Sequence, residues 1–181
     1  MAGRYVALLR GINVGRARRV AMADLRALLE ELGYRDVRTL LNSGNAVFTA
    51  SGVAPEEAAA RIEGALFARV GFAARTMVLT AEELVVAVEQ NPLLEIATDP
   101  SRLYVAVLAE PADLVRLEPL LAEDWSPEML ALGARVAYLW CPAGVIESRL
   151  VEAVGRAVGD AVTMRNSTTM AKLGALARTP R

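Results

Sequence analysis

The 181-residue sequence contains no histidine and a single cysteine, Cys141. Disulfide bonds within the chain, zinc clusters of cysteine and histidine, Cys-His nucleophile pairs and histidine general bases are therefore excluded. No apolar run approaches the roughly 18 residues that a membrane-spanning helix needs. The first residues, MAGRYVALLRG, carry charge too early for a signal peptide. We therefore expect a cytoplasmic protein with no metal, no cofactor and no contact with a membrane.

Lysine is also scarce, because Lys172 is the only lysine among the 20 basic residues. Residues 1–23 hold five arginines and no acid, residues 161–181 hold four basic residues and no acid, and all 21 acids lie between them. If the two ends of the chain meet, they form a positive patch on an acidic body. Two plainer explanations stay open: high-GC codon usage favours arginine, and arginines near a chain end can simply be solvated.

Hydrophobic periodicity predicts a strand, a helix, two strands, a helix and a strand in the first half. RYVALLR indicates a buried strand, and apolar residues from Met22 recur at helical spacing until Gly33. VRTLL and AVFTA indicate two strands joined by NSGN, which suits a tight turn. Pro55 predicts the start of a second helix that Gly71 ends, and the strand ARTMVLT follows. A Thr80 cap then predicts the helix AEELVVAVEQ.

The same order recurs in the second half. RLYVAVLA, MLAL, RVAYLWC and AVTMR indicate strands, and PADLVRLEPLLAE, GVIESRLVEAVGRAVG and STTMAKLGALA indicate helices. The repeat predicts an internal duplication in an α+β protein, with two ferredoxin-like βαββαβ units in tandem. Each unit would have a mainly antiparallel sheet with helices packed on one face. The expected domains are residues 1–95, with the RGINVG loop and the SGN hairpin, and residues 96–181, ending in the RNSTTMAKL helix.

The ferredoxin-like order brings two polar loops of the first half together. The first and second strands run in the same direction, so the loop GINVGRARR and the turn NSGN leave the sheet at the same end. The third strand pairs beside the first in this topology. We therefore expect Arg10 and Asn13 to lie near Asn42, Ser43 and Asn45.

Three blocks of sequence carry a resemblance to a known family. They are YVALLRGINVG with the following MADLRALLEELG, then TLLNSGNAVF, then TMRNSTTMAKLGALA. With these blocks at these separations, the chain resembles the bacterial DUF1697 family of uncharacterised proteins over essentially its whole length. The resemblance implies an α+β fold of ferredoxin-like character and no established activity. The chain departs from the family pattern at Arg16, where a second glycine is usual, and at Ser167, where an aromatic residue is frequent.

The residue types in these blocks suit a negatively charged group. Arginine offers a planar fork of donors to phosphate or carboxylate, glycine lets backbone N–H groups approach closely, and asparagine can both donate and accept. The last block begins a helix that Ser167 or Thr168 would cap, with Lys172 one turn further on. The candidate ligand-binding residues, on which the family pattern falls except at Asn42, are Arg10, Gly11, Asn13, Gly15, Asn42, Ser43, Gly44, Asn45, Arg165, Asn166, Thr169 and Lys172.

The motif segments RGINVG, NSGN and RNSTTMAKL contain no carboxylate, histidine or thiol, so we assign no catalytic residue and no metal ligand. The predicted function is the binding of a phosphate-bearing ligand, either a nucleotide or a nucleic-acid backbone. Two alternatives stay open. The motif residues can be architectural parts of a protein-interaction scaffold, or the chain can be an enzyme of unrecognised mechanism. The sequence indicates no oligomeric state.

Overall fold

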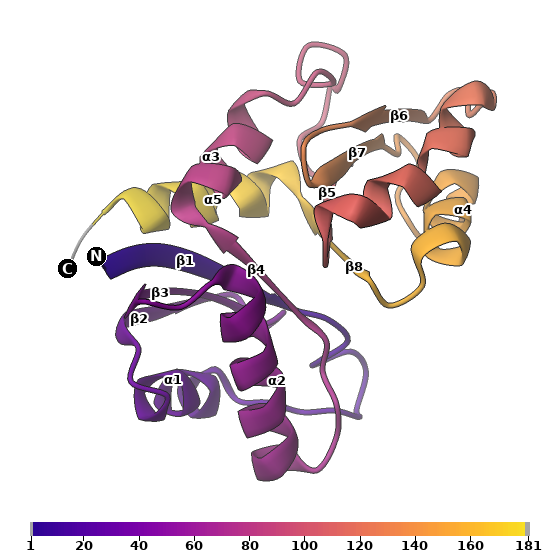
Figure 1. Ribbon diagram of the computed structural model, residues 1–181. Helices are drawn as coiled ribbons and strands as arrows, with labels where there is room; N and C mark the ends of the chain where they lie inside the picture. The colour runs from indigo at the N-terminus through magenta and orange to yellow at the C-terminus, as the bar shows by residue number, and fades with distance from the viewer. Residues whose placement is uncertain (1, 180–181) are drawn as a thin grey trace. The chain divides into compact units, whose positions relative to one another are not determined.

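The computed structural model describes residues 2–179, and Met1, Pro180 and Arg181 lie outside the described residues. Contacts divide the chain into two compact units (Figure 1). Unit 1 combines Met1–Leu84 with Leu173–Arg181, and unit 2 is Val85–Lys172. Within residues 2–179, no helix combines the length and the apolar character that crossing a membrane would need.

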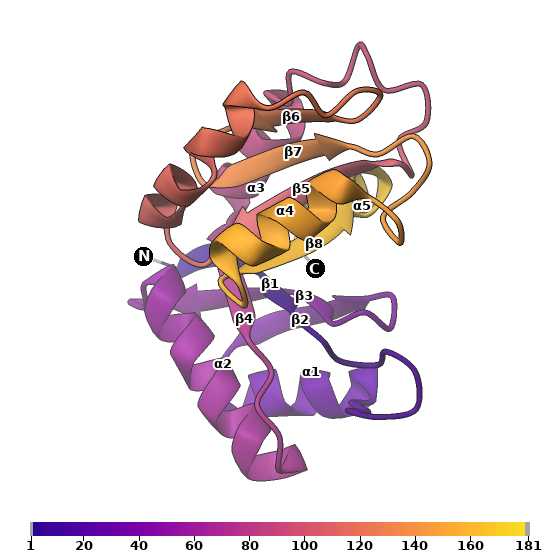
Figure 2. The same ribbon diagram turned by 90° about the vertical axis from the view of Figure 1, so that its right-hand side faces the viewer.

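Unit 1 contains a four-stranded antiparallel sheet in the order β2-β3-β1-β4, which confirms the ferredoxin-like fold prediction. Its elements are β1 (Ala2–Leu9), α1 (Met22–Glu31), β2 (Arg35–Leu40), β3 (Asn45–Ser51), α2 (Pro55–Val70) and β4 (Thr76–Thr80). Both α1 and α2 lie on one face of this sheet (Figures 1 and 2). Leu25 and Leu29 from α1 and Ile62 from α2 pack with Ala7 and Phe48 of the sheet to form the core.

Local sequence explains where the helices of unit 1 begin and end. Pro55 occupies the first turn of α2, where its missing N–H costs no hydrogen bond, and Gly71 ends the helix with a φ of 76°. The helix α3 (Ala81–Glu89) begins with a reciprocal cap. The Thr80 hydroxyl accepts a hydrogen bond from the Glu83 N–H, and the Glu83 carboxylate accepts one from the Thr80 N–H. The predicted Thr80 cap is therefore confirmed.

The end of the chain completes unit 1. The last helix, α5 (Ser167–Arg178), begins in unit 2, and its final turns belong to unit 1. Arg38 of β2 donates to the carbonyl oxygens of Leu176, at 2.7 Å, and Thr179, and Arg4 of β1 donates to that of Thr179 at 3.1 Å. Because the last carbonyls of a helix have no partner within the helix, these arginines satisfy backbone groups at the end of α5.

Unit 2 repeats the strand order of unit 1. Its antiparallel sheet has the order β6-β7-β5-β8. Its own elements are β5 (Leu103–Leu108), the 3₁₀ helices η1 (Pro111–Arg116) and η2 (Glu118–Ala122), β6 (Met129–Leu132), β7 (Val136–Trp140), α4 (Arg149–Val158) and β8 (Val162–Asn166). The helix α4 covers the sheet (Figure 2) and buries Leu150 and Val154 against Leu108 and Leu139. The tandem ferredoxin-like arrangement is therefore confirmed.

Two of the predicted helices differ in the structure. The helix predicted over residues 111–123 is a pair of 3₁₀ segments, because Pro119 lacks an N–H and its ring clashes with the carbonyl of Val115 in an α-helix. The helix predicted over residues 144–159 begins only at Arg149. There the hydroxyl of Ser148 accepts a hydrogen bond from the Val151 N–H at 3.0 Å and caps the helix.

Candidate functional site

The loop after β1 lies against the turn that joins β2 and β3. Leu8 and Asn45 are partners in the β1–β3 ladder, and the Leu9 N–H donates to the Gly44 carbonyl at 2.8 Å. The Asn13 side-chain amide of the loop donates to the Asn42 carbonyl of the turn at 2.7 Å. The predicted contact between the two polar loops is therefore confirmed. We call residues 10–19 the arginine loop and residues 41–44 the hairpin turn.

Asn13 organises the arginine loop from the inside. Its side-chain oxygen accepts from the Val20 N–H at 2.9 Å, and its amide donates to the Val20 carbonyl at 2.8 Å as well as to Asn42. Its backbone N–H donates to the Arg18 carbonyl at 3.0 Å. Asn13 also adopts a φ of 56°, which asparagine tolerates better than most residues. The side chain of Asn13 therefore connects the first part of the loop to Val20, which follows the loop, and to the hairpin turn.

Asn45 and Gly44 build the hairpin turn. The fully buried Asn45 side chain donates to the Leu40 carbonyl at 2.8 Å and to the Ser43 hydroxyl at 2.9 Å. Gly44 has a φ of 85°, and a Cβ atom at this position would lie 2.8 Å from both Leu9 and Ile12. Only glycine fits such a close approach without a shift of its neighbours. The turn and the arginine loop therefore depend on one another for their shape.

The arginines of the loop lie on its outer surface. Arg16, Arg18 and Arg19 are exposed, and Arg10 is half-buried at the point where the loop leaves the sheet. Within residues 2–179, no carboxylate forms an ion pair with any of the three exposed arginines. Val14, with 74% of its surface exposed, lies in the same loop. The loop therefore presents positive charge on a backbone that its own hydrogen bonds hold.

The candidate residues of the second half lie in unit 2, whereas the arginine loop and the hairpin turn lie in unit 1. Arg165 donates to the Thr163 hydroxyl at 3.0 Å and to the Met164 carbonyl at 2.9 Å, and burial lowers the pKa of its guanidinium to about 10. The Asn166 side chain accepts from the Thr169 N–H at 2.9 Å. Asn166 is thus the cap of α5, and the predicted cap at Ser167 or Thr168 is wrong because the helix begins at Ser167 itself.

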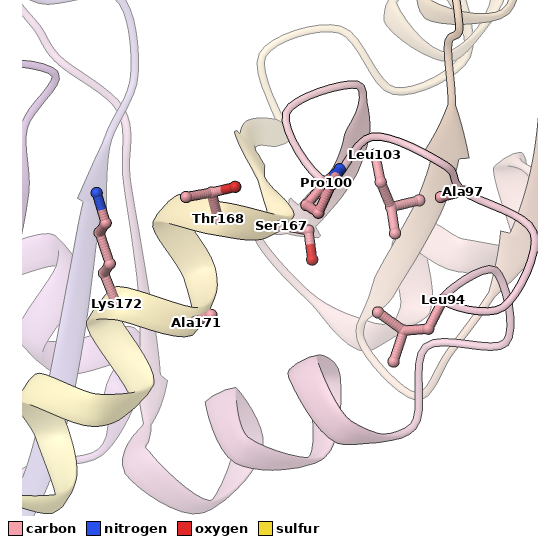
Figure 3. A pocket seen from close by; sticks show the side chains of 8 residues that line it. All are labelled: Leu94, Ala97, Pro100, Leu103, Ser167, Thr168, Ala171 and Lys172. Atoms are coloured by element: carbon pink, nitrogen blue, oxygen red, sulfur yellow. The ribbon is translucent and has the colours of Figure 1, made fainter.

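Of the four candidate residues in the second half, Lys172 is the one that lines a pocket. This pocket of about 430 Å³ lies within unit 2, and Figure 3 shows the side chains around it. The residues that line it are Leu94, Ala97, Pro100, Leu103, Ser167, Thr168, Ala171 and Lys172. Arg165, Asn166 and Thr169 are not among them. Sequence reasoning missed the wall from Leu94 to Pro100, because that segment is irregular and has no periodicity to interpret.

The family model described as a protein of unknown function, DUF1697, matches residues 2–138. The chain belongs to this family. The resemblance read from the three sequence blocks is therefore confirmed. The matched range includes the arginine loop and the hairpin turn, and it ends before Arg165 and Lys172.

A solved structure extends the likeness of this DUF1697 member to almost the whole chain. It is described as the structure of conserved bacterial protein SP0830 from Streptococcus pneumoniae. That protein is 25% identical in sequence and superimposes with a TM-score of 0.75, over 98% of this chain and 100% of its own. No curated protein matches the chain. The comparisons therefore support an uncharacterised, conserved bacterial family.

The single thiol of this DUF1697 protein is held in its neutral form. Cys141 is fully buried, and its sulfur lies 3.6 Å from the hydroxyl oxygen of Ser148. Burial raises the pKa of the Cys141 thiol to about 11. Because the thiolate is the nucleophilic form, Cys141 is not a nucleophile at neutral pH. Within residues 2–179, no cluster of three or more histidine, cysteine, aspartate or glutamate side chains could hold a metal ion.

Proposed function

We propose that this chain is a cytoplasmic binding protein whose arginine loop takes a phosphate-bearing ligand, either a nucleotide or a nucleic-acid backbone. One observation carries the proposal. Arg16, Arg18 and Arg19 are exposed without a carboxylate partner in the described chain, on a loop that Asn13 holds in shape.

Guanidinium groups are well matched to phosphate. Each has a planar fork of N–H donors, and an ionised donor bonded to an ionised acceptor gives a stronger hydrogen bond than a neutral pair. The chain has a net charge of -1, so attraction of anions must come from a local surface rather than from the whole molecule. The arginine loop supplies such a surface, because residues 1–23 hold no acid.

The internal hydrogen bonds of the loop reduce the cost of binding. A loop that must be ordered by its ligand loses conformational entropy at that moment, which weakens affinity. Here the Asn13 side chain already connects Val20 and Asn42, and Gly44 sits against Leu9 and Ile12. The arginine side chains remain to be ordered, but the backbone that carries them is already shaped.

Charge removal at matched positions tests the proposal. The loop variant carries Arg16→Gln, Arg18→Gln and Arg19→Gln, none of which breaks a hydrogen bond described above. The control variant loses the same charge from three exposed arginines that pair within their own helices, and its substitutions are Arg61→Gln, Arg116→Gln and Arg156→Gln. Binding of a labelled single-stranded RNA and DNA by anisotropy, and of ATP by calorimetry, is then measured at several salt concentrations.

The nucleic-acid form of the proposal predicts a strong dependence on salt. Each phosphate contacted on a single strand contributes about 0.7 to the slope of log affinity against log salt, so three contacts give a slope of about −2. The loop variant should lose most of this slope, and the control variant should keep it. A nucleotide ligand would instead bind stoichiometrically with a weaker slope. Equal losses in the two variants, or no binding by the native protein, would contradict the proposal.

A second candidate function is a protein-interaction scaffold in which the motif residues are architectural. The hydrogen bonds of Asn13 and Asn45 favour it, because both side chains bond to protein groups in or next to the loop and the turn. This candidate predicts self-association or partner binding that the loop variant leaves unchanged. Solution mass by light scattering on the native protein and on the loop variant distinguishes it from ligand binding.

A further inference from the structure

We infer that the outer edge of β6 is a docking site for an extended segment of a partner protein that alternates apolar and basic residues. β6 is the first strand in the order β6-β7-β5-β8, so β7 is its one neighbour in the sheet, and Figure 2 shows the two side by side. Every residue of β6 is exposed or half-buried, whereas every residue of β7 is buried. The inference does not involve the arginine loop and goes beyond the proposed function.

The register of the sheet shows which backbone groups of β6 face outward. The Gly133 N–H donates to the Val136 carbonyl across the β6–β7 hairpin at 2.8 Å. Hydrogen-bonded pairs alternate along an antiparallel ladder, so Ala131 bonds to β7, and the N–H and C=O groups of Leu130 and Leu132 point away from it. Within residues 2–179 these outward groups form no hydrogen bond. A new strand would find both donors and acceptors there.

The other sheet edges carry features that hinder the addition of a strand. A register shift interrupts the pairing of β2 with β3. On β4 the Thr76 N–H donates to the Glu63 carboxylate at 2.7 Å, and on β8 the Met164 carbonyl accepts from the Arg165 guanidinium at 2.9 Å. Bulges and charged side chains are ordinary protection for sheet edges. β6, with the sequence MLAL, has no charged residue and no proline, so its edge lacks this protection.

Apolar residues in the partner segment are indicated by the side chains of β6. Leu130 and Leu132 pack against the core that α4 and Trp125 cover. Because side chains alternate along a strand, Met129 and Ala131 lie on the opposite face. Met129 is 38% exposed. An added strand would therefore place every second side chain beside Met129 and Ala131, and the others on the side where Trp125 packs.

Basic residues in the partner segment are indicated by the acids that precede β6. Residues 118–128, which we call the acidic segment, hold four acids and no base. Three of these acids, Glu123, Asp124 and Glu128, line a pocket of about 220 Å³ together with Met129 and Leu130. This volume is below the range of about 300–1,000 Å³ for small-molecule sites, so it suits one side chain of a larger partner.

The negative charge of this pocket is only partly balanced. Asp124 and Glu128 accept hydrogen bonds from backbone N–H groups, which position the carboxylates without adding a base. Arg149 lies over the Trp125 ring at 5.8 Å and offsets one negative charge. Within residues 2–179, none of the three acids, Glu123 included, forms an ion pair. A basic side chain on the added strand would therefore be attracted to this end of β6.

A partner segment suits this edge better than a second copy of the chain. Four strand residues are only about 14 Å long, whereas a stable interface between proteins buries about 1,200–2,000 Å² in total. Pairing through β6 alone is therefore too small for a stable dimer, and it would bring two acidic segments to one interface. An extended peptide gains main-chain hydrogen bonds from an exposed edge without needing a large surface.

The probe is a labelled hexapeptide that alternates arginine with valine, and its binding is measured by fluorescence anisotropy. In the charge control, glutamate replaces arginine. Two further peptides carry N-methyl groups on either all the arginines or all the valines. Only alternate N–H groups of an added strand face the sheet, so one methylated peptide should bind and the other should not.

Amide hydrogen exchange followed by NMR locates the peptide. In the free protein the Leu130 and Leu132 amides should exchange faster than that of Ala131. At a peptide concentration ten times Kd, exchange at Leu130 and Leu132 should slow by about tenfold, because the bound fraction is protected. Exchange at Ala131 should change little, since its N–H already bonds to β7.

Charge variants test the acidic segment. Glu123→Gln, Asp124→Asn and Glu128→Gln together should weaken binding by about tenfold, because they remove the surface charges that a basic segment meets and keep the hydrogen-bond acceptors. The control variant loses the same charge from exposed acids elsewhere in the chain. Its substitutions are Glu30→Gln, Glu82→Gln and Glu95→Gln, and it should bind as the native protein does.

Four results would overturn the inference. One is the absence of saturable binding by the arginine–valine peptide, or equal binding by the glutamate–valine peptide. Another is equal affinity of the two methylated peptides, which would exclude main-chain pairing. The third is binding that leaves exchange at Leu130 and Leu132 unchanged. The fourth is a dimeric solution mass with slow exchange at Leu130 and Leu132 before peptide is added, which would give the edge to a second copy. The loop variant of the preceding section should bind the peptide normally, so the two proposals can fail independently.

Discussion

Gly44→Ala tests the close approach between the arginine loop and the hairpin turn. The added Cβ destabilises the folded state in two separate ways. A left-handed backbone conformation costs a non-glycine residue about 1–2 kcal/mol. Gly44 has this conformation, with a φ of 85°, and its Cβ would also lie 2.8 Å from the Cβ of Leu9 and the Cδ1 of Ile12. Overpacking a buried site costs about 1–3 kcal/mol more, so the expected loss of unfolding free energy is about 2–5 kcal/mol.

Gly15→Ala provides the matched control for this prediction. Gly15 has a φ of 62° in the same loop, but a Cβ there would meet no atom within 4 Å. It should therefore cost only the conformational term of about 1–2 kcal/mol. Urea unfolding followed by far-ultraviolet circular dichroism gives both values from the shift in midpoint. If the two variants lose the same free energy, the contact of Gly44 with Leu9 and Ile12 is absent, and the shape of the arginine loop described above is refuted.

Two further predictions concern single side chains. Thr80→Ala should lower the unfolding free energy by about 1 kcal/mol, because the Glu83 N–H loses its hydrogen-bond acceptor. Thr98→Ala, at an exposed position, is the control and should change the unfolding free energy little. Equal urea midpoints for the two variants would contradict the role of Thr80 as a cap. For Cys141, the folded state raises the thiol pKa from 9.0 to about 11, so the unfolded chain ionises first as pH rises. The stabilising contribution of the neutral thiol is present below pH 9 and is lost between pH 9 and about 11. Over that range, urea midpoints of the native protein should fall more steeply than those of Cys141→Ala, and parallel profiles would contradict the burial argument.

Most of the fold could be predicted because its signals are local. Pro55, Gly71 and Thr80 each mark a helix boundary by a property of their own backbone or side chain, and all three boundaries are confirmed. The contact between the arginine loop and the hairpin turn is not local, yet it follows from the strand order alone. Once β3 pairs with β1, the ends of these strands bring Leu8 beside Asn45.

The parts that could not be predicted depend on long-range contacts or on exceptions within a pattern. Arg38 donates a hydrogen bond to the Leu176 carbonyl near the end of α5. Nothing in the sequence around Arg38 indicates a partner so far along the chain. The segment around Pro119 has the periodicity of an α-helix, but Pro119 breaks the helix that this periodicity predicts. The pocket wall between Leu94 and Leu103 is irregular, so no repeating pattern could identify it.

The candidate site also shows why polar residues in a loop are hard to interpret from sequence. Asn13 and Asn45 could serve a ligand or the backbone equally well, since an amide donates and accepts in either role. In the structure Asn13 bonds to Val20 and Asn42, and Asn45 bonds to Leu40 and Ser43, all of which lie in or next to the loop and the turn. The asparagines and Gly44 therefore give the loop its shape, and its charge comes from Arg16, Arg18 and Arg19.

Substitutions in this loop can therefore change its surface charge without changing the shape of its backbone. Arg16 stands where the family resemblance leads us to expect a second glycine, and its side chain is exposed, so it changes the surface charge without entering the hydrogen bonds of Asn13. Variants of Asn13 or Gly44 should lower stability and binding together, because they alter the backbone that carries the arginines. Variants of the arginines should lower binding alone. If the arginine variants lose the ligand at unchanged stability, binding depends directly on the surface charge of this chain, and on the glycines and asparagines only through the shape that they give the loop.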